Sequence, residues 1–287
     1  MKISGDGKVV FGKFTNISPD VEIVFLNQGG NILIGDYCQI GSRVKIIVTS
    51  GDIKIDDWTS IHDGCLLLST RGIKIGQHCW FGQNSVLDGT GGLTIGNSVR
   101  VGMYSQLWSH VAAGEQYEGC TLKGEKPIFI HDNVWLVGSC ICSPGVTIEK
   151  FAVALSQSNI TKSIRPFEVV GGSPAVTKPK MNFYQKFTLE QKFNLLKGWL
   201  QEFVQIQDDR FFVEFKKRQI HIFNSTQSIK FFCSSLDYEK NKNINKSNEN
   251  VSVDLERKIY TKKYSTIEKT LFKFLADNKV RFLKDEC

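Results

Sequence analysis

The feature that most limits how this chain can fold is an apolar residue that recurs every six positions. The recurring residues form the sets Ile34, Ile40 and Ile46; Ile55, Ile61 and Leu67; Ile75, Phe81 and Leu87; and Ile95, Val101 and Leu107. Four positions after many of them stand small or β-branched residues, namely Cys38, Val44, Thr59, Cys65, Cys79, Ser85, Val99 and Ser105. An amphipathic helix would space its apolar residues three and four apart, so this period excludes a helix.

The hexads come in groups of three, which predicts a coil of three short strands. The groups begin at 34, 55, 75 and 95, and the pattern resumes at Ile130 and Ile148. Glycine follows the apolar position at Gly35 and Gly76, where the backbone has to turn tightly. Coils of this kind stack into a solenoid. The sequence therefore predicts a mainly β fold, a left-handed parallel β-helix over residues 1–180. Residues 1–33 fit the hexads poorly and are expected to form an imperfect N-terminal coil that covers the open strand edges.

Charge divides the chain into two parts. Residues 1–177 carry 14 Lys and Arg against 15 Asp and Glu, whereas residues 178–287 carry 22 against 14. The positive excess lies in the C-terminal third, which indicates a second domain with another task. A basic face could contact phosphates, although a solvated lysine-rich surface is the simpler interpretation.

The cysteines and the apolar runs set further limits. The spacing of the eight cysteines fits neither metal-ligand pairs nor a secreted disulfide framework, so we expect reduced thiols, most of them in the core. No apolar run approaches the roughly 18 residues that cross a bilayer, and the N-terminus lacks a signal-peptide stretch. We expect a cytoplasmic protein without an integral membrane segment.

The C-terminal residues 181–287 lack hexads and are expected to form a small α+β appendage. Thr188 with Gln191, and Ser265 with Glu268, have the spacing of capping boxes that begin helices. Residues 211–223 alternate like a strand or hairpin, and the asparagine- and lysine-rich residues 238–250 are expected to form a loop. Such an appendage could shape an acceptor groove, bind a lipid-linked or polyanionic glycan, or stabilise an oligomer; the last is our default.

Three motifs resemble a known family. They are NVWLVGSCICSPGVTI (133–148), ALSQSNITKSIRP (154–166) and VVGGSPAV (169–176). Together they resemble the hexapeptide-repeat acyltransferases that use acetyl-coenzyme A, and among these the sugar and polysaccharide O-acetyltransferases. The resemblance implies a homotrimer with active sites between subunits, acetyl-CoA as co-substrate, a sugar acceptor, and neither metal nor nucleic acid. The chain departs from the family at Val137 and Leu155, where glycine is usual, at Cys142, where an aliphatic residue is usual, and at Val176, where a basic residue is frequent.

The long step between the hexad groups at 95 and 130 contains the candidate active site. His110 comes three residues after Leu107, and the polar insertion 111–126 begins directly after it. An imidazole can accept a hydroxyl proton near pH 7 and return it to a leaving thiolate. The resemblance implies that His110 is the general base, that the insertion walls the active site, and that Trp135 flanks the acetyl group or the acceptor.

The resemblance also implies binding residues. Those for coenzyme A are Gly138, Ser156, Thr161, Lys162 and Lys178, and those for the acceptor are Asn84 and Asp88. A turn-forming role for Asp88 in LDGTGG is an equally good interpretation.

Two alternatives remain open on the sequence. The acceptor could be the amine of an amino sugar, which needs less help from a base. The β-helix could also be a non-catalytic trimeric scaffold that presents the basic domain to a partner. A three-histidine zinc site is not expected, because His62, His78 and His131 lie at unrelated positions of the repeat.

Overall fold

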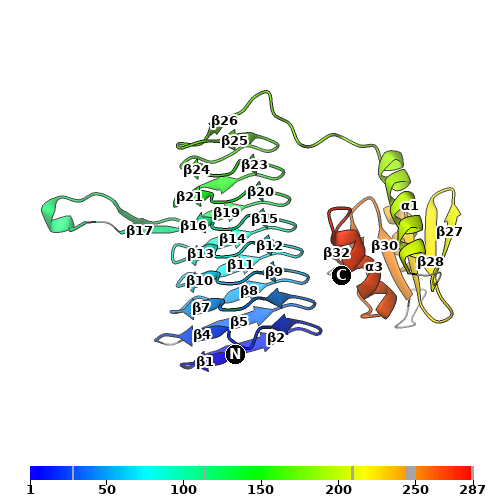
Figure 1. Ribbon diagram of the computed structural model, residues 1–287, viewed down its shortest axis with the longest axis horizontal. Helices are drawn as coiled ribbons and strands as arrows, with labels where there is room; N and C mark the ends of the chain where they lie inside the picture. Colours follow the sequence, from blue (N-terminus) through cyan, green and yellow to red (C-terminus); the bar gives the residue numbers. More distant parts are fainter. Residues whose placement is uncertain (28, 113, 208–209, 243–249, 286–287) are drawn as a thin grey trace. The chain divides into compact units, whose positions relative to one another are not determined.

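The computed structural model describes residues 1–27, 29–112, 114–207, 210–242 and 250–285 (Figure 1). The chain forms two compact units, Met1–Tyr184 and Gln185–Cys287.

Three parallel sheets make up the first unit, and each coil of the chain adds one strand to each sheet (Figure 1). The first sheet contains β1 (Lys2–Ser4), β4 (Glu22–Phe25), β7 (Lys45–Val48), β10 (Leu66–Ser69), β13 (Val86–Gly89), β16 (Gln106–Leu107), β21 (Ile141–Cys142) and β24 (Asn159–Ile160). The second contains β2 (Lys8–Phe11), β5 (Asn31–Ile34), β8 (Ile53–Ile55), β11 (Ile73–Ile75), β14 (Leu93–Ile95), β19 (Ile128–Ile130) and β22 (Thr147–Ile148). The third contains β3 (Asn16–Ile17), β6 (Gln39–Ile40), β9 (Ser60–Ile61), β12 (Trp80–Phe81), β15 (Arg100–Val101), β20 (Trp135–Leu136), β23 (Val153–Ala154) and β25 (Val169–Gly171), with β26 (Val176–Thr177) antiparallel at its end. The predicted left-handed parallel β-helix is confirmed.

The hexad residues form the core, as predicted. In the first sheet Leu67 pairs with Leu87 and Leu87 with Leu107, and all three side chains are fully buried. The small positions of the hexads are buried too, including Thr59 and Ser105. Removing these aliphatic side chains from water supplies most of the driving force for stacking the coils.

Most of the thiols lie in this core. Cys38, Cys65, Cys79, Cys140 and Cys142 are buried in the first unit, and the cysteines among the described residues are all free. The Cys65 thiol donates to the Gly82 carbonyl at 3.2 Å. Burial raises the pKa of Cys38 and of Cys79 to about 12, so these groups are unreactive packing residues.

The N-terminal residues are more regular than the sequence suggested. Strands β1, β2 and β3 pair in parallel with β4, β5 and β6, so residues 1–33 continue all three sheets in register. Strands β1, β2 and β3 are the end strands of their sheets and pair with the next coil, and Val21, Ile23 and Ile32 of this segment are buried in the core. Ile3 and Val10 on them are 45% and 41% exposed.

The insertion leaves the β-helix without breaking it. Strands β17 (His110–Ala112) and β18 (Lys123–Glu125) pair antiparallel, and the 3-10 turn η1 (Gln116–Glu118) lies between them. Figure 1 shows this ribbon extending away from the stacked sheets. The chain then re-enters at β19, whose Ile128 pairs with Leu93 of β14, so the coil continues in register.

The second unit is the predicted α+β domain. Its sheet has the order β27 (Phe212–Lys216), β28 (Gln219–Phe223), β29 (Ser228–Phe232), β30 (Asn250–Asp254), β31 (Ile259–Tyr260) and β32 (Leu283–Lys284). Its helices are α1 (Leu189–Ile206), α2 (Ser235–Asn241) and α3 (Thr266–Ala276). None of the helices within the described residues has the length and apolar content needed to cross a bilayer.

Local sequence signals account for most of these elements. Thr188 accepts from the Gln191 N–H, and the Gln191 side chain accepts from the Thr188 N–H, which is the predicted capping box of α1. Ser265 caps α3 by accepting from the Glu268 N–H. The predicted hairpin is β27–β28. Helix α2 was not predicted; it includes the start of the expected loop 238–250, and residues 243–249 lie outside the described ones.

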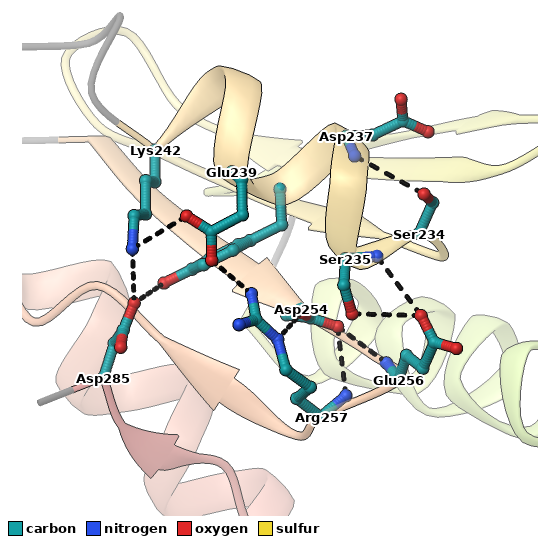
Figure 2. Close-up of polar contacts among 10 residues, drawn as sticks. Ser234, Ser235, Asp237, Glu239, Lys242, Asp254, Glu256, Arg257 and Asp285 are labelled. Atoms are coloured by element: carbon teal, nitrogen blue, oxygen red, sulfur yellow. Dashed lines mark hydrogen bonds and ion pairs between the residues drawn. The ribbon is translucent and has the colours of Figure 1, made fainter. Parts of the chain in front are cut away.

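Ion pairs join α2 to two distant segments of the second unit (Figure 2). Arg257 donates to Asp254 and to Glu239, both at 2.6 Å, and Lys242 lies 3.0 Å from Glu239. The Tyr238 hydroxyl donates to Asp285 at 2.7 Å. Acidic and basic groups alternate through this network, so it fastens α2 to the segment after β30 and to the segment after β32.

Candidate active site

His110 and Asp88 form a close pair on neighbouring coils. His110 is the first residue of β17, just beyond β16, and Asp88 belongs to the adjacent strand β13. The Nδ1 atom of His110 lies 2.7 Å from Oδ2 of Asp88. The Asp88 side chain is fully buried, whereas that of His110 is 34% exposed. The imidazole therefore has one nitrogen tied to a buried carboxylate and a surface open to a ligand.

The Asp88 carboxylate is saturated by hydrogen bonds. Oδ2 accepts from the Ser109 N–H at 2.8 Å, the Ser109 hydroxyl at 2.9 Å and the His110 N–H at 3.1 Å. Oδ1 accepts from the Thr90 hydroxyl at 2.6 Å and the Thr90 N–H at 3.1 Å. Burial acts to raise the pKa of Asp88, but hydrogen bonds from Thr90, His110 and Ser109 outweigh it and hold that pKa below its usual value. Asp88 is thus an ionised carboxylate at neutral pH.

This arrangement fixes how His110 can act. An ionised carboxylate only accepts hydrogen bonds, so the Nδ1 atom of His110 carries the proton. In the neutral ring the lone pair then lies on Nε2. The ring of Trp108 stands edge-on to the imidazole with centroids 6.0 Å apart, and the Trp108 Nε1–H donates to the Gln106 side chain at 2.9 Å. In this arrangement the Nε2 lone pair of neutral His110 is free to accept a proton.

The inserted ribbon is rooted at the same place. His110 pairs with Glu125 across β17 and β18, and Glu125 lies 2.9 Å from Arg71 of an earlier coil. The Lys126 N–H donates to the Ser109 carbonyl at 2.9 Å, while the Gly91 N–H donates to the Ser109 hydroxyl at 2.8 Å. Ser109 thus holds both the carboxylate and the return of the ribbon.

The structure corrects the expectation that Asp88 contacts the acceptor. Its carboxylate is buried and its oxygens are occupied by Thr90, Ser109 and His110, so it positions the histidine instead. The alternative interpretation, a turn-forming residue, is confirmed, because Asp88 accepts from the N–H two residues on. Asn84 is exposed and has a φ of 57° at the corner between β12 and β13.

Sequence reasoning missed Thr90 and Ser109 as partners of Asp88. The spacing between equivalent hexads on successive coils could have identified these partners. Leu87 pairs with Leu107, so residues just after them must be neighbours on successive coils.

Trp135 lies away from His110 within one chain. It is in β20 of the third sheet, paired with Arg100 and Val153, and is 41% exposed. His110 follows a strand of the first sheet. The two residues therefore occupy different faces of the same β-helix.

The residues expected to bind coenzyme A fall at different places. Gly138 and Ser156 follow β20 and β23, neighbours in the third sheet, and the Gln157 N–H donates to the Gly138 carbonyl at 2.9 Å. Thr161 and Lys162 follow β24, which lies two strands from β16 in the first sheet. Lys178 follows β26. Ser156, Thr161 and Lys162 are exposed, so they are open to a ligand.

Metal-ligand groups do not converge in the described part of the chain, where no three His, Cys, Asp or Glu residues are arranged to hold an ion. The ring of His62 lies 5.0 Å from that of Trp80, and buried His78 stacks at 5.9 Å on Trp58. His131 is 3.8 Å from Glu149. Each of these histidines has a local packing or ion-pair role.

Known proteins resemble the chain in both sequence and fold. It is 34% identical over 105 residues to Nodulation protein L of Rhizobium meliloti (strain 1021), covering 36% of this chain and 57% of the relative. It is 31% identical over 116 residues to Galactoside O-acetyltransferase of Lactococcus lactis subsp. lactis (strain IL1403), covering 40% of this chain and 47% of the relative. The chain thus spans about half the length of these curated relatives. No protein-family model matches it.

Two solved structures share the architecture. The polySia-specific acetyltransferase NeuO superposes with a TM-score of 0.57 at 16% identity, covering 70% of this chain and 97% of NeuO. The polysialic acid O-acetyltransferase OatWY superposes with a TM-score of 0.51 at 18% identity, covering 66% of this chain and 96% of OatWY. These likenesses show the fold alone. With the two sequence relatives, they confirm the resemblance to sugar O-acetyltransferases of the left-handed β-helix type.

Proposed function

We propose that this protein is an O-acetyltransferase that moves an acetyl group from acetyl-CoA to a hydroxyl of a sugar or surface polysaccharide. The observation that carries the proposal is the 2.7 Å pair between partly exposed His110 and buried Asp88 at the root of the inserted ribbon. Sequence similarity to a galactoside O-acetyltransferase supports the choice of donor and acceptor.

The pair supplies the chemistry that such a transfer needs. Nε2 of His110 takes the proton of the acceptor hydroxyl while that oxygen attacks the thioester carbonyl carbon. The C–S bond then breaks, the ester C–O bond remains, and the protonated imidazole returns the proton to the departing thiolate. Asp88 stabilises the imidazolium that forms in between. General base catalysis of this kind contributes roughly 10²–10⁴ in rate.

A homotrimer would complete the site. Within one chain Trp135 lies in the third sheet and His110 beyond the first, so their joint action requires Trp135 of a neighbouring subunit. The residues proposed for coenzyme A also lie on two sheets, because Gly138 and Ser156 follow strands of the third sheet whereas Thr161 and Lys162 follow a strand of the first. Gly138 and Ser156 would contact the pantetheine through their backbone, and Thr161, Lys162 and Lys178 would lie near the nucleotide. The cytoplasm, which supplies acetyl-CoA, is the proposed location.

We also propose roles for Asn84, for the insertion and for the two domains. Asn84 is exposed at the corner before β13, the strand that carries Asp88, and would contact the acceptor. The insertion 111–126 would wall the active site, because its ribbon begins at His110 itself. The β-helix, residues 1–180, would therefore be the catalytic domain, and residues 181–287 an added domain.

Calorimetry with coenzyme A, followed by transfer assays on a panel of acceptors, tests the proposal. Binding with acetylation of sugar hydroxyls supports it. Acetylation confined to amino sugars would make the protein an N-acetyltransferase. Absence of coenzyme A binding would leave a trimeric scaffold and refute the enzyme. Mass measurement of the native protein tests the trimer.

A further inference from the structure

One sheet face of the second unit combines aromatic and basic side chains, and it is open along β27 and β28 but closed toward β30, where Phe232 and Asp254 are buried. Residues directly opposite one another on paired strands share a face. The register therefore places three cross-strand rows on one side of the sheet: Phe212, Phe223 and Ser228; Glu214, His221 and Lys230; and Lys216, Gln219 and Phe232. The alternate residues, such as Ile220 and Ile222, are buried on the opposite side. We name Phe212, Lys216, His221, Phe223 and Lys230 the aromatic–basic face.

Its aromatic rings form a continuous surface. His221 stacks on Phe223 with centroids 4.7 Å apart and an interplanar angle of 27°, and Phe223 lies 5.8 Å from Phe212. Phe212 is 58% exposed on β27, the edge strand of the sheet. Exposed aromatic residues on an edge strand carry an aggregation risk, which indicates that this surface has a partner.

The surroundings of these rings are positively charged. The turn from β27 to β28 presents Lys216, Lys217 and Arg218, all exposed, and Lys230 lies opposite His221. Within the described residues none of these four cations forms an ion pair with a carboxylate. The one acidic residue in the rows is Glu214, whose carboxylate is 3.9 Å from His221. The face is therefore complementary to an anionic partner.

His221 contributes an uncharged aromatic ring to this face, and not a positive charge. Burial lowers its pKa, Lys230 and Lys216 lower it further, and Glu214 opposes them. The imidazole is thus neutral near pH 7 and extends the stacking surface of Phe223 and Phe212.

We propose that the aromatic–basic face binds an anionic polysaccharide chain, the acceptor polymer of the transferase proposed above. The flat faces of sugar rings would stack on Phe212, His221 and Phe223, while Lys216 and Lys230 neutralise carboxylates or phosphates along the chain. Acetylation requires only one sugar in the active site, so a second contact holds the polymer and raises its effective concentration there. This inference rests on the proposed function for the identity of the polymer.

Binding of full-length protein to defined polymers tests the inference directly. The probes are polysialic acid, neutral dextran of similar length and single-stranded oligo-dT. The expected result is binding to polysialic acid that weakens with salt, and little binding to dextran. Lys216→Gln with Lys230→Gln should weaken it on the order of tenfold, and Phe212→Ala should weaken it as well. The matched control is Lys8→Gln with Lys273→Gln, which removes two exposed lysines elsewhere and should leave binding unchanged.

The readouts separate this inference from the transferase proposal. The Lys216→Gln and Lys230→Gln pair should raise KM for the polymer and leave kcat/KM for a short sugar acceptor unchanged. His110→Ala should still bind the polymer. Equal loss in the control pair, or preference for oligo-dT, would overturn the polysaccharide assignment even if acetyl transfer is observed. Conversely, polymer binding without acetyl transfer would refute only the transferase.

Discussion

Replacing Asp88 by asparagine removes a buried charge from six hydrogen bonds. The two carboxylate oxygens accept from Thr90, Ser109 and His110, each of which donates twice. An amide has one acceptor oxygen, so its NH₂ group must face donors on one side. The least costly orientation turns it toward Thr90, whose hydroxyl can rotate to accept. The Thr90 N–H is then left unpaired, which costs about 1–3 kcal/mol of stability.

Catalysis should suffer more than folding. Asparagine can still accept from Nδ1 of His110, but the imidazolium loses its neighbouring negative charge. We expect kcat for acetyl transfer to fall on the order of 10²-fold, measured by release of free coenzyme A thiol.

Thr90→Val is the matched control for this prediction. It removes the 2.6 Å hydroxyl bond to Asp88 and leaves the bond to His110 intact. Stability should fall by about 1 kcal/mol with kcat nearly unchanged. Equal loss of kcat in both variants would show that Asp88 is only structural.

Three further predictions concern stability and reactivity. Burial raises the pKa of Glu268 to about 7, so its favourable contribution is present below the unfolded value of about 4.5 and is lost as pH rises through 7. Glu268→Gln should therefore flatten the pH dependence of unfolding and stabilise the protein above pH 7, by on the order of 3 kcal/mol; an unchanged slope in denaturant titrations would contradict this. Thr188→Ala removes the capping box of α1 and should cost about 1 kcal/mol in the unfolding transition of the second unit, whereas no loss would contradict the cap. Burial raises the pKa of Cys142 far above its usual range, so this thiol should resist alkylation in the native protein and react after unfolding, as peptide mass mapping can check; rapid native labelling would refute its burial.

The β-helix was predictable because its repeat is a direct consequence of geometry. Each coil must place residues such as Leu67, Leu87 and Leu107 at the same inward position, and the sequence shows that period plainly. In residues 1–33 the same period continues less plainly, as Phe11, Ile17 and Ile23, and Ile23 is buried in the core. Parallel pairing with the following coil completes the order of this segment.

The site was predictable only in part. His110 stands out beside an insertion, but the role of Asp88 depends on which residues are neighbours on successive coils. Helix α2 was missed although a local signal was present, because Ser234 caps it by accepting from the Asp237 N–H. Its ion pairs with distant residues, such as Lys242 with Asp285 (Figure 2), are not contained in any local pattern.

The most direct test of the account is the single-turnover rate of acetyl transfer by His110→Ala. The expected result is a trimer that binds coenzyme A normally and transfers acetyl at least about 10²-fold more slowly. A variant that binds donor and acceptor and still transfers acetyl at the wild-type rate would show that His110 is not the base.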